Sequence, residues 1–270
     1  YQGVRDLQDL DFSTSVLETV RAIMHRPNGI VFVTGPTGCG KTTTLYAMLK
    51  ALNQDAANIM TVEDPVEYRL AGVNQIQINP AIDLRFANVL RSLLRQDPDI
   101  MLVGEIRDFE TARIACQAAL TGHLVLTTMH TNNSLQAITR LIEMGIESYI
   151  ALPAVTGVIA QRLVRRLCEH CRKEEPLPPA RIEELAAAAG EKVSKSWHPL
   201  GCERCDNIGY RGRLAIQEAF LLTDDFRARL KPGMAAQEIK ALAEEYGFKS
   251  LRQDRIRKAL SGLTSLKNVE

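Results

Sequence analysis

A glycine-rich segment between an apolar run and a helix-prone run constrains this chain more than any other feature. Residues 35–42 read Gly-Pro-Thr-Gly-Cys-Gly-Lys-Thr and match the pattern G-x-x-x-x-G-K followed by Ser or Thr. The apolar run 29–34 precedes the segment, and the helix-prone run 43–50 follows it. In this order they predict a phosphate-binding loop, whose glycines let backbone N–H groups face phosphate oxygens at a helix N-terminus. An ordinary glycine-rich turn is the alternative interpretation.

The loop predicts a site for ATP and Mg²⁺. We expect Lys41 to bind the β- and γ-phosphates and the Thr42 hydroxyl to bind Mg²⁺. The residues expected to contact the nucleotide are Gly35, Pro36, Thr37, Gly38, Cys39, Gly40, Lys41, Thr42 and Thr43.

Composition narrows the class of protein. The chain has 270 residues, of which 46% are hydrophobic, enough for a full core and more than one domain. Its net charge of +1 gives no electrostatic argument for nucleic-acid binding. No apolar run approaches the roughly 18 residues of a membrane span, and the first residues lack a signal-peptide pattern. We therefore expect a cytoplasmic protein.

Short apolar runs alternate with helical patterns after the loop. This alternation predicts an α/β fold with a largely parallel sheet that helices cover on both faces. Beyond residue 145 the pattern turns helical, and a short strand and further helices follow the cysteine pairs. The expected strands are 29–34, 58–62, 75–78, 99–103, 123–128 and 213–220, and the expected helices are 13–26, 43–50, 84–96, 109–121 and 150–167.

Two glutamates and a histidine at strand ends are candidate catalytic residues. Glu105 follows an apolar strand and a glycine, and Glu63 ends an earlier strand. Either carboxylate could polarise water while the other holds Mg²⁺ through its water shell, or both could be helix caps and solvated strand ends. His130 also follows a strand, where open α/β sheets bind ligands, although a lone histidine there more often caps or packs. Arg107 is close enough to Glu105 in sequence to reach phosphate.

Four of the six cysteines form two C-x-x-C pairs. The pairs supply the four thiolates that tetrahedral Zn²⁺ requires, and a reducing compartment favours metal over disulfides. The segment 172–201 between the pairs is longer than usual, which raises the cost of loop closure only modestly. His170 and His198 are alternative ligands, and disulfides or unpaired thiols are the other interpretation. The preferred zinc ligands are Cys168, Cys171, Cys202 and Cys205.

Five ordered motifs resemble the secretion ATPase superfamily, the hexameric motors of type II secretion and type IV pilus assembly. The resemblance runs from about residue 28 to the C-terminus. It implies that Glu63 belongs to the family's Asp box as the catalytic base, Glu105 to its atypical Walker B motif and His130 to its His box. The motifs are residues 35–42, 61–67, 90–99, 103–108 and 121–132.

The resemblance also implies fold, regions and partners. Assembly and secretion members carry a tetracysteine module, whereas retraction motors lack it. We expect the full-length protein to form a homo-hexamer that is peripheral at the cytoplasmic face of the inner membrane. Its expected partners are an inner-membrane platform protein and the cytoplasmic domain of a secretion or pilus assembly protein. We expect no nucleic-acid partner. The expected regions are a linker from a missing N-terminal domain (1–12), a RecA-like P-loop ATPase core (13–160), a tetracysteine zinc module (161–212) and a mainly helical C-terminal region (213–270).

Two other functions are compatible with the phosphate loop. In a nucleic-acid-handling P-loop ATPase, the cysteine module and the cluster Arg162, Arg165 and Arg166 would grip phosphates. A nucleotide-binding regulator would hydrolyse little ATP. Because family members carry a preceding domain whose arginines reach the nucleotide, we expect this chain alone to bind Mg-nucleotide, to associate weakly and to hydrolyse ATP slowly.

Overall fold

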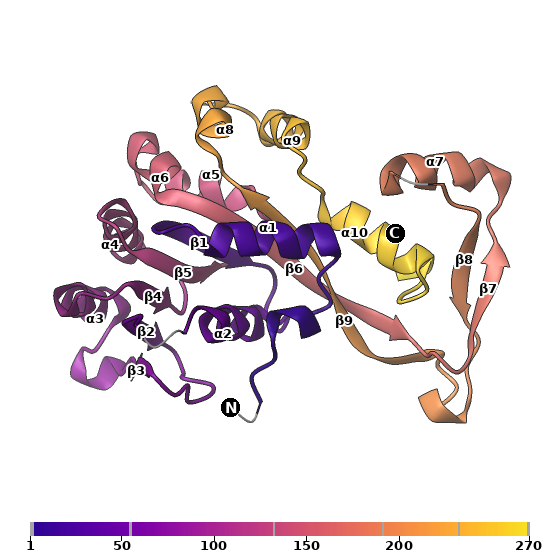
Figure 1. The fold of residues 1–270 in the computed structure, drawn as a ribbon, viewed down its shortest axis with the longest axis horizontal. Helices are drawn as coiled ribbons and strands as arrows, with labels where there is room; N and C mark the ends of the chain where they lie inside the picture. The colour runs from indigo at the N-terminus through magenta and orange to yellow at the C-terminus, as the bar shows by residue number, and fades with distance from the viewer. Residues whose placement is uncertain (1–2, 54–55, 132, 191, 232, 269–270) are drawn as a thin grey trace.

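A computed structural model describes residues 3–53, 56–131, 133–190, 192–231 and 233–268. Its centre is a seven-stranded sheet in the order β3-β2-β4-β5-β1-β6-β9 (Figure 1). Every neighbouring pair is parallel except β6 and β9, which run antiparallel. The expected RecA-like α/β architecture is confirmed. The strands are β1 (Gly29–Thr34), β2 (Ile59–Glu63), β3 (Val73–Gln77), β4 (Ile100–Val103), β5 (Leu124–Met129), β6 (Val155–Leu167) and β9 (Tyr210–Leu221).

Helices cover both faces of this sheet, and two apolar layers result. One layer lies beneath α1 (Thr14–Met24), α2 (Lys41–Leu52) and the short 3₁₀ helix η1 (Leu7–Asp9). The other layer lies beneath α3 (Phe86–Leu93), α4 (Phe109–Leu120), α5 (Gln136–Glu143), α6 (Ser148–Ala154), α8 (Asp224–Arg229) and α9 (Ala236–Glu245). Two further 3₁₀ turns are η2 (Pro80–Ile82) and η3 (Leu94–Gln96).

The prediction of one helix over residues 150–167 is wrong. Helix α6 ends at Ala154, and the chain continues as the 13-residue strand β6. Pro153 lies in the last turn of α6, and the next residues are rich in β-branched side chains that pair with β1 and β9. The expected region boundaries after residues 160 and 212 therefore fall inside β6 and β9.

The segment between the cysteine pairs is folded and packs on the C-terminal helix α10 (Leu251–Leu260). Leu185 and Ala189 share a small apolar cluster with Ile256 of α10. The ring of Trp197 lies so close to Gly262 that a Cβ there would come within 2.9 Å of it. The elements of this part are β7 (Arg172–Pro176), α7 (Pro179–Ala189), β8 (Lys195–Pro199), η4 (Glu203–Cys205) and, after α10, η5 (Leu266–Asn268).

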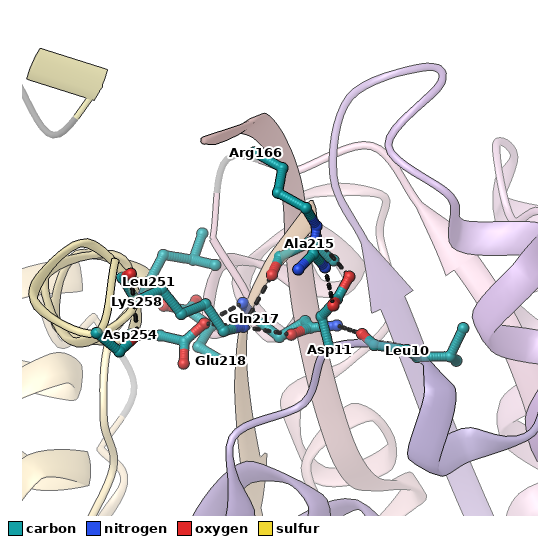
Figure 2. Close-up of polar contacts among 10 residues, drawn as sticks. Leu10, Asp11, Arg166, Ala215, Gln217, Glu218, Leu251, Asp254 and Lys258 are labelled. Carbon is teal, nitrogen blue, oxygen red and sulfur yellow. Dashed lines mark hydrogen bonds and ion pairs between the residues drawn. The ribbon is translucent and has the colours of Figure 1, made fainter. Parts of the chain in front are cut away.

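The first described residues pack on the core instead of extending away from it. Leu7 and Leu10 are buried in the layer beneath α1 and α2. The Leu10 carbonyl accepts a 2.6 Å hydrogen bond from Gln217 Nε2 of β9, and Asp11 forms a 2.5 Å ion pair with Arg166 of β6 (Figure 2). Residues 3–12, expected as part of a linker, are thus attached to the last two strands of the sheet.

A buried ion pair within α10 is hydrogen-bonded to β9 (Figure 2). Lys258 Nζ lies 2.7 Å from an Asp254 carboxylate oxygen, and both side chains are buried. Lys258 Nζ also donates to Gln217 Oε1 at 3.0 Å, while the Gln217 backbone N–H donates to Asp254 at 2.9 Å. On the other face of β9, Glu218 accepts hydrogen bonds from the backbone N–H groups of Leu251 and Ser134, each at 2.7 Å.

Candidate nucleotide site

The phosphate loop occupies the connection between β1 and α2. Gly40 adopts a left-handed conformation with φ of 90° directly before the helix begins at Lys41. Gly35 has φ of 143°, and a Cβ there would lie 2.4 Å from the Gln161 carbonyl oxygen and 2.7 Å from Cys39 Sγ. Any larger residue at Gly35 would therefore collide with the neighbouring strand β6.

Lys41 is held at the mouth of this loop. Its Nζ donates to the carbonyl oxygens of Gly35 at 2.9 Å and Pro36 at 3.2 Å. Partial burial lowers the pKa of Lys41, and the charges of Cys39 and Glu105 act against this shift. Thr42 and Thr43, in the first turn of α2, are exposed. Their hydroxyls and the Lys41 ammonium are accessible to a bound phosphate.

The candidate catalytic residues line the same cleft as the loop. This cleft has a volume of about 510 Å³ and lies between the start of α2 and the carboxyl ends of β2, β4 and β5. Parallel strands bring their carboxyl ends to one edge, which is where such sheets bind ligands. The predicted site residues that line it are Thr37, Gly38, Gly40, Lys41, Thr42, Thr43, Glu63, Glu105, Arg107 and His130.

Three predicted loop residues lie elsewhere. Gly35 and Pro36 line an adjoining cavity of about 620 Å³, which His130 also borders. The Cys39 side chain is buried, and this burial raises the pKa of its thiol. Cys39 therefore offers the nucleotide only its backbone.

Glu105 joins the predicted arginine and histidine in one cluster. Its carboxylate lies 2.7 Å from Arg107 Nε and 3.7 Å from His130 Nε2. The Glu105 side chain is 17% exposed, whereas those of Arg107 and His130 are 71% and 47% exposed. The acidic group is therefore anchored at the strand end, and its two partners project into the cleft.

Glu63 is bound by donors from three elements and is almost fully buried. Tyr46 and Thr61 donate their hydroxyls to its carboxylate, each at 2.5 Å, and Gln75 Nε2 donates at 3.2 Å. Burial and the neighbouring Glu63 carboxylate both raise the pKa of Tyr46, so this hydroxyl keeps its proton. These bonds hold the Glu63 carboxylate in one orientation beside the loop.

Sequence reasoning missed these supporting residues and the buried Gln161. Tyr46 follows the loop motif on the same helix and reads as an ordinary apolar position. Gln161 donates to the Cys39 carbonyl, a partner 122 positions away in sequence, and it lies on a strand that the pattern predicts as a helix. The sequence offers no local signal for either contact.

The four predicted zinc ligands come together at the far ends of β6 and β9. The Sγ atoms of Cys168, Cys171, Cys202 and Cys205 all lie within 4.8 Å of one another. Neighbouring sulfurs are 3.7–3.9 Å apart, well beyond the ~2.05 Å of a disulfide bond. Backbone N–H groups of Cys202 and Gly209 donate to Cys205 Sγ, which suits a thiolate. Four converging thiolates with such support fit tetrahedral Zn²⁺.

The alternative ligands and the other cysteines lie outside this cluster. His170 contacts Arg204 at 2.9 Å, and His198 contacts Ser196 at 3.1 Å. Cys39 and Cys116 are buried free thiols.

The three arginines expected to grip nucleic acid have different surroundings in the structure. Arg165 stacks on the Tyr210 ring at 4.1 Å, and Arg166 is ion-paired with Asp11. Arg162 lines the cavity beside Gly35. The ion pair with Asp11 therefore offsets part of the positive charge that this alternative requires.

Known proteins resemble the chain over almost its whole length. The model of the family described as "Type II/IV secretion system protein" matches residues 2–270. The type II secretion system protein HxcR of Pseudomonas aeruginosa is 48% identical over 263 residues, which cover 97% of this chain and 52% of the relative. The type IV pilus assembly ATPase PilB of Thermus thermophilus is 47% identical over 267 residues, covering 98% of this chain and 30% of the relative. The chain thus spans about half, or less, of these relatives.

Solved structures share the fold. The pilus retraction motor PilT, crystallised with bound ADP, superimposes with a TM-score of 0.73 and 26% identity, covering 100% of this chain and 67% of PilT. The ATPase DotB of Legionella pneumophila matches with a TM-score of 0.69 and 23% identity, covering 98% of this chain and 64% of DotB. The DotB likeness concerns the fold alone.

Proposed function

The chain belongs to the type II/IV secretion system protein family, and we propose that it is the ATP-hydrolysing part of a motor for type II protein secretion or type IV pilus assembly. One observation carries the proposal. Lys41, Glu63, Glu105, Arg107 and His130 line a single cleft beside a phosphate loop. A phosphate-binding loop, acidic side chains and positively charged side chains are the groups that the transfer of a phosphoryl group to water requires.

Each group in the cleft has a separate role. Lys41 binds the β- and γ-phosphates, and Thr42 would hold Mg²⁺ with Glu105 acting through water. When bound, Mg²⁺ supplies positive charge to the phosphate oxygens. Glu63 takes the proton of the attacking water, and its three hydrogen-bond donors support this role by fixing its orientation. Arg107 and His130, the more exposed members of the cluster, contact the γ-phosphate.

The tetracysteine cluster binds one Zn²⁺ with a structural role. All four coordination positions are filled by protein thiolates, which leaves none open for chemistry. The fold around the cluster supports this assignment, because β7, α7 and β8 are built on a segment whose two ends carry the cysteine pairs.

The full-length protein would act as a homo-hexamer at the cytoplasmic face of the inner membrane. Among the helices that the structure describes, none combines the length and apolar content of a membrane span. We therefore propose peripheral attachment through an inner-membrane platform protein and the cytoplasmic domain of a secretion or pilus assembly protein. Names of both secretion and pilus proteins among the relatives support either system equally. No nucleic-acid partner is proposed.

Phosphate release from MgATP tests the proposal. The full-length protein should hydrolyse ATP, and Lys41→Ala should lower turnover about a hundredfold because the cation on the transferred phosphate is lost. Added DNA should leave the rate unchanged. Wild-type turnover equal to that of Lys41→Ala would refute the ATPase assignment, and stimulation by DNA would favour the nucleic-acid-handling alternative.

A further inference from the structure

We propose that Gln161 is a positioning residue that fixes the shape of the phosphate loop from the neighbouring strand and thereby sets nucleotide affinity. The inference deepens the proposed function and rests on nucleotide binding at this loop. Gln161 lies on β6, more than a hundred positions from the loop in sequence, and its side chain is 2% exposed.

The amide of Gln161 connects two points of the turn that carries Lys41. Its Nε2 donates to the Cys39 carbonyl oxygen at 2.8 Å, directly before the last loop glycine. Its Oε1 accepts from the Thr44 hydroxyl at 2.7 Å, in the first turn of α2. Lys41 and Thr42 lie between these two anchor points. One side chain therefore holds the turn on both sides of the phosphate-binding residues.

The backbone of β6 brings this side chain against the loop. Thr34, the last residue of β1, pairs with Ala160, so Gln161 lies beside Gly35. A Cβ on Gly35 would come within 2.4 Å of the Gln161 carbonyl oxygen, and a Cβ on Gly40 within 3.3 Å of its Nε2. Both the first and the last glycine of the loop are therefore packed against this one residue.

Glutamine suits the position because its amide donates and accepts at once. The carbonyl of Cys39 needs a donor, and the hydroxyl of Thr44 needs an acceptor. A carboxylate of the same shape offers no donor, and an apolar side chain of similar length offers neither group. Loss of these bonds frees the loop to turn its N–H groups away from the phosphates, which weakens binding without removing any group that touches nucleotide.

Gln217 provides a matched control. It stands directly opposite Gln161 in the β6–β9 pairing, on the same face of the sheet, and is equally buried. Its side chain, however, bonds to the Leu10 carbonyl and to Lys258 (Figure 2). The two glutamines thus share strand environment and burial but differ in partner.

The experiment compares Gln161→Met with Gln217→Met in the 270-residue chain. Calorimetric titration with MgADP gives the dissociation constant, and thermal unfolding with and without MgADP gives stability and its nucleotide-dependent increase. Both variants should unfold at lower temperature than wild type. Only Gln161→Met should bind MgADP about tenfold more weakly. Equal affinity in Gln161→Met and wild type, or an equal loss in Gln217→Met, would overturn the proposal.

Two further variants separate the possible failures. Thr44→Val keeps the bond to Cys39 and removes only the hydroxyl, so it should weaken MgADP binding about threefold even if Gln161→Met does not fold. Wild-type affinity in Thr44→Val would then count against the role of Gln161. Lys41→Ala reports on the site itself. If it binds MgADP as tightly as wild type, the nucleotide-site assignment fails, whatever Gln161 does.

Discussion

At the scale of single residues, the two glutamates of the cleft have different surroundings. Glu63 is buried and accepts three protein hydrogen bonds, whereas Glu105 faces the more exposed side chains of Arg107 and His130 at the cleft edge. A carboxylate fixed by neutral donors is oriented for proton transfer, while a carboxylate at the cleft edge can contact the waters of a bound metal. The phosphate loop and both acids could be predicted from local patterns. Tyr46 and Gln161 could not, because their partners are distant in sequence.

Replacing either acid should separate binding from turnover. Glu63→Gln and Glu105→Gln keep the side-chain shape, so both variants should still bind MgATP. Glu63→Gln should lower kcat by about a hundredfold or more, because an amide cannot accept the proton of water. Steady-state kinetics and MgATP titration check this result. Wild-type turnover in Glu63→Gln would transfer the base assignment to Glu105.

The Tyr46 hydroxyl should affect kcat more than KM. Tyr46→Phe removes one of the three donors to Glu63 and adds no bulk, so the carboxylate loses part of its orientation. We expect kcat to fall about tenfold with KM nearly unchanged. Tyr149→Phe, at a tyrosine that is 74% exposed, is the control and should behave as wild type. A change in KM alone would show that Tyr46 serves binding and not the base.

At the scale of elements, most of the strands and helices that the periodicity predicts are present, and β6 is the strand that the periodicity predicts as a helix. Its apolar and basic residues recur at spacings that also fit a helix, and a short buried run cannot be assigned by periodicity alone. Pairing with β1 on one side and β9 on the other decides the conformation, and both partners are remote in sequence. The strand character of 155–167 is therefore a tertiary effect.

The buried ion pair between Asp254 and Lys258 should stabilise α10 against β9. Lys258→Met leaves Asp254 buried without its cation and should lower the free energy of unfolding by about 3 kcal/mol. The double variant Asp254→Leu with Lys258→Met removes both charges. Its free energy of unfolding should fall by less than that of Lys258→Met alone. Urea unfolding of the two variants measures the difference. If the double variant is less stable than Lys258→Met, the ion pair stabilises the fold by more than the neutralisation of one buried charge by the other.

At the scale of the whole molecule, α10 connects parts that the sequence suggests are separate. The segment 172–201 packs on one side of this helix, and β9 with the Leu10 carbonyl lies on the other. The four cysteines could be predicted as a cluster from their spacing. The packing of the module on α10 could not, because Trp197 and Gly262 carry no pattern that pairs them.

Zinc removal should disturb the module and α10 while sparing the nucleotide site. Elemental analysis should find one zinc per chain, and Cys202→Ser should lower the midpoint of thermal unfolding while MgADP affinity stays near wild type. Trp197 is the single tryptophan of the chain and packs against Gly262, so chelation should change its fluorescence. Zinc-free protein with unchanged fluorescence and stability would contradict a structural metal.

The antiparallel pairing of β6 with β9 limits the insertions that these two strands tolerate. Successive side chains in a strand alternate between faces, so a single inserted residue reverses the face of every residue beyond it. Here one residue inserted before Ile216 would move the Gln217 amide to the position of Glu218, at the contacts of Ser134 and Leu251, and would place Ile216 opposite Gln161. Odd-numbered insertions within this ribbon should therefore disrupt both sets of contacts, because they move the polar side chains to the opposite face of the sheet.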